Sequence, residues 1–89
     1  MKLSATLTEI PRDAFLGCVA LKTIEIPEGV TSIGSNAFFG CKNLIEVTIP
    51  ASVEKIGSGA FDGCPKLKVH MKSQLRITKG MFPETTKFL

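Results

Sequence analysis

The feature that most constrains the fold of this chain is an internal repeat with a period of 23 residues. A fixed period of this length is the signature of repeat architectures. The repeated positions include Ala14, Ala37 and Ala60, Phe15, Phe38 and Phe61, Gly17, Gly40 and Gly63, and Cys18, Cys41 and Cys64. A unit this short cannot bury its own apolar side, so neighbouring units must cover one another. The repeat therefore predicts a solenoid.

Each unit contains one segment with the pattern of a short β-strand. Residues 21–26 and 44–49 end in an alternation of apolar and polar residues, with β-branched residues at the inward positions. Pro27 and Pro50 follow directly, and proline cannot donate a hydrogen bond to a strand ladder. We expect these strands to stack in parallel along one side of the solenoid, because each lies one full unit after the last.

A second segment of each unit predicts a single helical or 3-10 turn on the other side. Residues 35–40 and 58–63 carry Ser or Asn near their start and end in Gly, which is typical of helix capping. Phe38 and Phe61 would then point into the core. In the first copy Pro11 begins this segment, which suits the first position of a helical turn because no N–H is needed there.

With 89 residues, the chain is short enough to form a single domain over 1–89. The terminal unit departs from the repeat, because one residue is missing between Leu67 and Val69. We divide the chain into a partial coil at 1–17, full coils at 18–40 and 41–63, and a degenerate terminal coil at 64–89.

The positive charge of the chain is concentrated at its C-terminal end. Residues 1–64 carry five Lys and Arg against seven Asp and Glu, whereas residues 65–89 carry six against one. We interpret this basic segment as a solvated cap that keeps the open end of the solenoid soluble. Contact with nucleic acid or an acidic surface is the alternative, but these residues belong to an irregular terminal coil, and we expect no nucleic-acid partner.

The sequence contains no pattern typical of a membrane span or of a signal peptide. No apolar run approaches the roughly 18 residues that a membrane span needs. The first residues also lack the apolar core of a signal peptide. We therefore expect no membrane insertion.

The repeated unit resembles the BspA-type leucine-rich repeat. The resemblance rests on the patterns Leu-x-x-Ile-x-Ile-Pro, Ile-Gly and Ala-Phe-x-Gly-Cys, over roughly residues 7–71. It implies an α/β-type repeat solenoid, a right-handed coil with short parallel strands on the concave side and single helical or 3-10 turns on the convex side. Several members of this family are bacterial or protozoan surface proteins that bind host proteins or mediate adhesion. The resemblance thus implies a protein partner and a secreted or cell-surface location.

The chemically active residues form no recognisable catalytic, metal or cofactor site. The three cysteines recur once per coil and do not converge on one point, so we interpret them as buried thiols. A disulfide between neighbouring coils is the alternative for a secreted chain. His70 has no Ser, Cys or carboxylate pair placed to use it, and the glycines follow no nucleotide-binding fingerprint. The sequence predicts no enzymatic activity, no catalytic residue, no metal and no cofactor.

The outward positions of the predicted strands are the candidate partner-binding residues, since solenoids use this face for recognition. The missing residue before Val69 predicts that His70 also turns outward. Ile45 is the one apolar residue of the set, which suits a small binding patch and is also common on any surface. The candidates are Lys22, Thr23, Glu25, Ile45, Glu46, Thr48, Lys68, His70 and Lys72.

Two functional hypotheses follow. The first is a non-enzymatic protein-binding or adhesion module that presents its concave surface to a macromolecular partner. The second is a structural or self-assembling unit, a homo-oligomer that stacks end to end. The second hypothesis rests on apolar residues at the two coil ends, namely Leu3, Leu7, Phe82 and Phe88.

Overall fold

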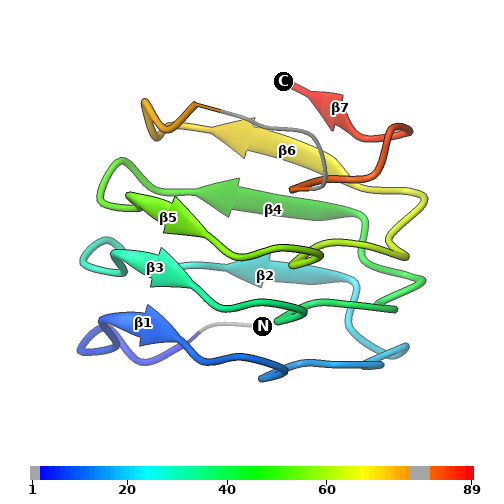
Figure 1. Cartoon of the computed structure of the whole chain (residues 1–89), viewed down its shortest axis with the longest axis horizontal. Helices are drawn as coiled ribbons and strands as arrows, with labels where there is room; N and C mark the ends of the chain where they lie inside the picture. The colour runs from blue at the N-terminus through cyan, green and yellow to red at the C-terminus, as the bar shows by residue number, and fades with distance from the viewer. Residues whose placement is uncertain (1–2, 77–80) are drawn as a thin grey trace.

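The computed structural model describes residues 3–76 and 81–89 and shows a stack of coils, each lying on the one before (Figure 1). Its strands are β1 (Glu9–Ile10), β2 (Thr23–Glu25), β3 (Ser32–Ile33), β4 (Glu46–Ile49), β5 (Lys55–Ile56), β6 (Lys68–Met71) and β7 (Lys87–Phe88). They form two parallel sheets, of order β2-β4-β6-β7 and β1-β3-β5. The predicted parallel solenoid is thereby confirmed.

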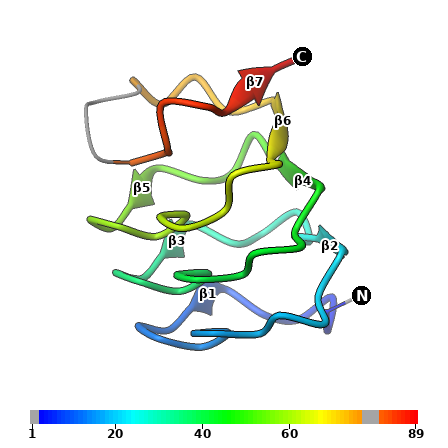
Figure 2. The ribbon, with the colours of Figure 1, turned by 90° about the vertical axis from the view of Figure 1, so that its right-hand side faces the viewer.

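The two sheets lie on different sides of each coil (Figure 2). β2, β4 and β6 form the side predicted from the sequence, whereas β1, β3 and β5 form a second ladder that the sequence pattern did not reveal. These second strands are only two residues long, so they carry too little alternation to be recognised. Their inward residues Ile10, Ile33 and Ile56 are buried and extend the core to this side.

The strands of the larger sheet pair as the repeat predicts, and the pairing shifts by one residue at β6, where the terminal coil lacks a residue. Ile24 pairs with Val47, one full period later. In the terminal coil Val47 pairs with Val69, and Thr48 lies opposite His70. The outward position predicted for His70 is therefore confirmed. β7 continues the sheet beyond β6.

The helical or 3-10 turns predicted for the convex side are wrong, because these segments form isolated turns in the described residues. Asn36 has a φ of 58°, and Asp13 and Gly59, at equivalent positions, have φ values of 59° and 71°. A residue in this left-handed region interrupts a right-handed helix. Each coil therefore changes direction here without building a helical turn.

Hydrogen bonds between coils replace the hydrogen bonds of a helix in these segments. The N–H of Ala37 donates to the carbonyl of Gly34 at 3.2 Å within one coil. The N–H of the next residue, Phe38, donates to the carbonyl of Ala60 in the following coil at 2.7 Å. The turn segments of neighbouring coils are thus connected by backbone hydrogen bonds, as the strands are.

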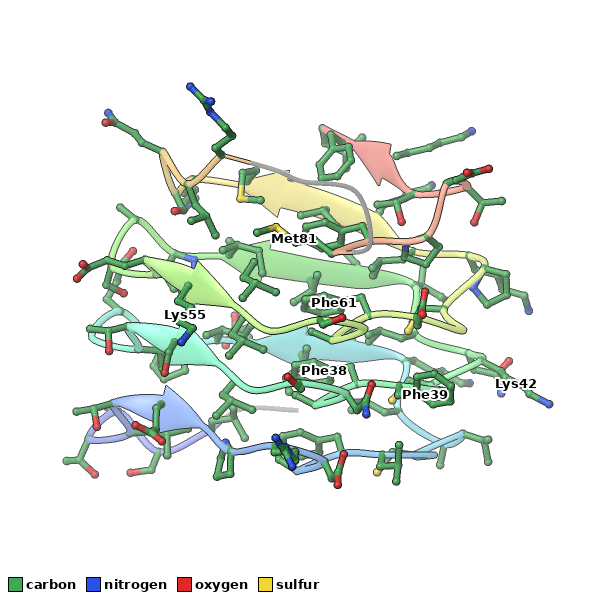
Figure 3. The ribbon with its side chains drawn as sticks, in the orientation of Figure 1. Phe38, Phe39, Lys42, Lys55, Phe61 and Met81 are labelled. Atoms are coloured by element: carbon green, nitrogen blue, oxygen red, sulfur yellow. The ribbon has the colours of Figure 1, made fainter. Side chains whose placement is uncertain are left out.

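Phenylalanine rings form a continuous column through the core. The ring centroids of Phe15, Phe38, Phe61 and Phe82 follow one another at 5.2, 5.0 and 4.9 Å, with interplanar angles of 4°, 9° and 14°. Phe88 contacts the edge of Phe82 at 5.2 Å. Phe38 and Phe61 are fully buried and point inward, as predicted (Figure 3). The column links the described coils through a large apolar contact.

Two glycines let neighbouring coils approach closely. A Cβ atom at Gly34 would lie 2.4 Å from the backbone nitrogen of Arg12. A Cβ atom at Gly57 would lie 2.4 Å from the backbone nitrogen of Ser35. A side chain at either position would force the coils apart, which explains why the repeat has glycine there.

Candidate binding face

Exposed and half-buried side chains follow two rows across the β2-β4-β6-β7 sheet, and we call this surface the sheet face. Neighbours within a row lie directly opposite one another on adjacent strands. The first row contains Thr23, Glu46, Lys68 and Lys87, and the second contains Glu25, Thr48 and His70. Six of the nine predicted residues are therefore brought together on one surface.

The other three predicted residues border the strands. Lys22 and Ile45 each lie one residue before a strand, and the N–H of Ile45 donates to the carbonyl of Lys22 at 2.7 Å. Ile45 is 42% exposed. Lys72 is exposed but lies one residue past β6, where the preceding coil has Pro50. Lys72 therefore flanks the sheet face and is not part of either row.

One side-chain contact crosses the two rows. Nε2 of His70 lies 2.8 Å from Oε2 of Glu46, and the two side chains are 40% and 48% exposed. Glu46 lies opposite Lys68, so this contact runs diagonally between β4 and β6. A pair this exposed adds little to stability, but it orients both side chains on the sheet face.

Lys87 belongs to the sheet face although sequence reasoning missed it. Counting from Phe82 places Phe88 at the position of Leu21, whereas in the structure Phe88 lies opposite Val69. Lys87 consequently lies opposite Lys68 on the neighbouring strand. Like charges directly opposite one another repel, so this edge of the sheet face is basic and favours an anionic contact.

Exposed apolar side chains at the turn segments were also missed. Leu16, Val19 and Phe39 are 50%, 51% and 43% exposed. Leu16 and Phe39 occupy equivalent positions in neighbouring coils, where the third coil has Asp62. Phe39 lies beside the turn that carries Lys42, away from the buried phenylalanine column (Figure 3). The sequence could have indicated this exposure, because the repeat position that holds Leu16 and Phe39 holds the acidic residue Asp62 in the third coil.

The three cysteines form a column of unpaired thiols. Sγ of Cys41 and Sγ of Cys64 each lie 3.2 Å from a carbonyl oxygen of the preceding coil, those of Phe15 and Phe38. Burial raises the pKa of Cys41 and raises the pKa of Cys64 to about 12. Both side chains are therefore neutral packing groups near neutral pH, as expected from the sequence. Cys18, for which the sequence also predicted a buried thiol, is only half-buried.

We expect Cys18 to react first with a disulfide reagent in the native protein, because it is only half-buried whereas Cys41 and Cys64 are buried. Only the thiolate is nucleophilic, and their raised pKa values keep Cys41 and Cys64 protonated. Mass spectrometry after labelling in buffer and in concentrated guanidinium chloride measures this order. Equal labelling rates of all three thiols in buffer would contradict it.

The raised pKa values also predict a loss of stability in alkaline solution. Thiols in the unfolded chain titrate near 9.0, whereas Cys64 in the fold titrates near 12. The unfolded state therefore binds fewer protons between these values, and stability falls as pH rises through this window. Urea denaturation as a function of pH measures the effect. Replacing Cys64 with alanine is expected to flatten that dependence.

Residues 3–76 and 81–89 hold neither a cluster of metal ligands nor a membrane-spanning helix. No group of three or more His, Cys, Asp or Glu residues in this part of the chain is placed to hold a metal ion. No helix within the same residues is long and apolar enough to cross a membrane.

Comparison with known proteins places the repeat in a family. The family model described as the BspA type leucine rich repeat region (6 copies) matches residues 1–88. No curated protein gives a significant match.

Two crystal structures of bacterial repeat proteins are similar to this chain. A leucine-rich repeat protein from T. pallidum is 42% identical with a TM-score of 0.74, over 76% of this chain and 32% of that chain. A leucine-rich repeat protein from Bacteroides ovatus is 30% identical with a TM-score of 0.75, over 92% of this chain and 28% of that chain. The chain spans under a third of the length of either protein. It belongs to the BspA-type leucine-rich repeat family.

Proposed function

We propose that this chain is a protein-binding or adhesion module that acts at a secreted or cell-surface location, and that the sheet face is its concave recognition surface. The observation that carries the proposal is a difference between the inward and outward positions of the strands. The inward residues Ile24, Val47 and Val69 are nearly identical and buried. The outward residues beside them differ from strand to strand. The core positions build the scaffold, and the outward positions are available for recognition.

The charges of the sheet face indicate the kind of partner. Glu25 and Glu46 lie on its first two strands, whereas Lys68 and Lys87 lie on its last two. A partner protein with the opposite order of charges would approach in one orientation, because such complementarity mainly sets association rate and register. The exposed side chain of Ile45 adds apolar contact beside Glu46.

The proposed module is not an enzyme. Members of this repeat family are typically non-catalytic. The one histidine, His70, contacts Glu46 on an open sheet surface instead of in an enclosed pocket. Cys41 and Cys64 are buried and protonated, so neither supports nucleophilic catalysis.

Charge reversal on the sheet face tests the binding proposal. The wild-type chain is immobilised and screened by surface plasmon resonance against a panel of purified extracellular proteins. For any protein that binds, Glu46→Lys and Lys68→Glu are expected to weaken binding at least about tenfold, since each replaces an attraction with a repulsion. Glu54→Lys and Lys42→Glu are matched controls, because both residues are exposed and lie off the sheet face. Unchanged binding by both sheet-face variants would count against this surface.

End-to-end assembly is the second candidate function, favoured by the two ends of the larger sheet. β2 and β7 are its outer strands, and at the β7 end Phe88 and Leu89 are 45% and 64% exposed. At the β2 end an apolar cavity of about 440 Å³ is lined by Phe15, Cys18 and Leu21, among others. Outer strands of a sheet favour pairing between chains. Sedimentation velocity showing only monomer at micromolar concentration would exclude this candidate.

A further inference from the structure

A cavity of about 260 Å³ lies away from the sheet face, on the side of the β1-β3-β5 sheet. Three successive coils contribute polar side chains to its lining. Arg12 comes from the first coil, Ser32 and Ser35 from the second, and Lys55 from the third. Ser32 lies directly opposite Lys55 on the neighbouring strand, and Figure 3 shows Lys55 reaching from β5 toward β3.

The two close-approach glycines contribute backbone to this cavity. Gly34 and Gly57 both line it. Neither position can carry a side chain, because a Cβ would lie 2.4 Å from backbone nitrogen of the preceding coil. At these two positions the lining is therefore bare backbone, and Arg12 and Lys55 are the long side chains in the rest of it.

The lining offers hydrogen-bond donors without competing partners. Neither Arg12 nor Lys55 forms an ion pair with a described residue, the pair of Glu46 and His70 being the one found there. Within the same part of the chain, the hydroxyl groups of Ser32 and Ser35 make no hydrogen bond. Guanidinium and ammonium groups only donate, and hydroxyl groups donate readily to an anion.

Three acidic side chains lie near the cavity without lining it. Glu9 lies opposite Ser32, on the side away from Lys55. Asp13 and Glu54 are exposed neighbours of Arg12 and Lys55 in the sequence. The lining itself holds two cations and no carboxylate, so these acidic groups oppose its positive charge only from outside the cavity.

We propose that this cavity binds one tetrahedral oxyanion group, the phosphate or sulfate monoester of a ligand. Stacked strands are about 4.8 Å apart, so each cation lies one such step from a serine of the middle coil, Arg12 from Ser35 and Lys55 from Ser32. Both side chains are long enough to converge on a group seated over Ser32 and Ser35. The guanidinium donates two parallel hydrogen bonds, the ammonium supplies a second charge, and the hydroxyl groups fill the remaining acceptor positions.

Titration with methyl phosphate and methyl sulfate, followed by ¹H–¹⁵N NMR at constant ionic strength, tests the proposal. We expect the largest amide shifts at Arg12, Ser35 and Lys55. Arg12→Gln and Lys55→Gln are each expected to weaken binding about tenfold, because each removes a charge-assisted hydrogen bond. Lys42→Gln is the matched control, since it removes the same charge from an exposed residue outside the cavity.

The two probes separate the two sources of the oxyanion. A phosphate monoester carries close to two negative charges above about pH 7, whereas a sulfate monoester carries one. Tighter binding of methyl phosphate assigns the cavity to phosphate esters, and equal or tighter binding of methyl sulfate assigns it to sulfate esters. Glu9→Gln is expected to tighten binding of either probe about twofold, because it removes a nearby negative charge.

Two results would overturn the proposal. The first is that Arg12→Gln and Lys55→Gln bind both probes as tightly as Lys42→Gln does. The second is that the amide shifts spread over the basic terminal coil and not the cavity, which would show general attraction to positive charge. In each variant, unchanged amide signals from residues outside the cavity verify that the protein remains folded. The sheet face takes no part in this test, so its outcome is independent of the proposed protein-binding function.

Discussion

Replacing Phe38 with alanine is expected to lower the free energy of unfolding by about 3–5 kcal/mol. Phe38 is fully buried and stacks on Phe15 at 5.2 Å and on Phe61 at 5.0 Å. Truncation removes both ring contacts and leaves a cavity in the middle of the column. Small domains are stable by only about 5–15 kcal/mol, so the variant should be close to unfolding at room temperature. Urea denaturation followed by circular dichroism measures the loss.

Phe39→Ala is the matched control for this prediction. Phe39 is the next residue in the chain, but its side chain is 43% exposed and lies outside the column. We expect a loss within about 0.5 kcal/mol, as for most surface substitutions. Similar losses for the two variants would show that burial in the column does not determine stability.

Gly57→Ala is expected to cost about 3 kcal/mol although it adds only one methyl group. The new Cβ would lie 2.4 Å from the backbone nitrogen of Ser35 and 2.8 Å from the carbonyl carbon of Gly34. These atoms are backbone, so they cannot rotate away. Separating the coils would also lengthen the hydrogen bond from Gly57 N–H to the carbonyl of Ile33, now 2.7 Å. Thermal and urea denaturation measure the change.

Gly17→Ala separates this steric effect from backbone strain. Gly17 has a φ of 70°, which is unfavourable for alanine, but a Cβ there would meet nothing within 4 Å. We expect a cost of about 1–2 kcal/mol from the left-handed conformation alone. If Gly17→Ala proved more damaging than Gly57→Ala, close approach of the coils at Gly57 would not be an important constraint.

The repeat predicted the stacking of coils because the same positions are buried in each coil. It did not predict the turns, because Ser35 and Asn36 were interpreted as helix caps. Asp13, Asn36 and Gly59 occupy one repeat position, and Asn, Asp and Gly are the residues that adopt a left-handed conformation most readily. The recurrence of these residue types at one repeat position indicated a turn instead of a helix.

The sheet face was predicted from strand alternation, but its detail was not. The contact between Glu46 and His70 is diagonal and depends on how the terminal coil absorbs its missing residue. The position of Lys87 depends on the path of that whole coil. The oxyanion cavity is lined by Arg12 from the first coil and Lys55 from the third. These residues line the same cavity because the backbones of successive coils approach closely at Gly34 and Gly57.

A continuous sheet face requires that the terminal coil stays in register despite its missing residue, and scalar couplings across hydrogen bonds test this most directly. In a ¹³C,¹⁵N-labelled sample, we predict couplings from the amide nitrogen of Ile45 to the carbonyl carbon of Lys22, from Lys68 to Ile45, and from Lys87 to Leu67. Coupling of Lys68 or Lys87 to any other carbonyl would contradict the account, because the outward rows would then not form one surface.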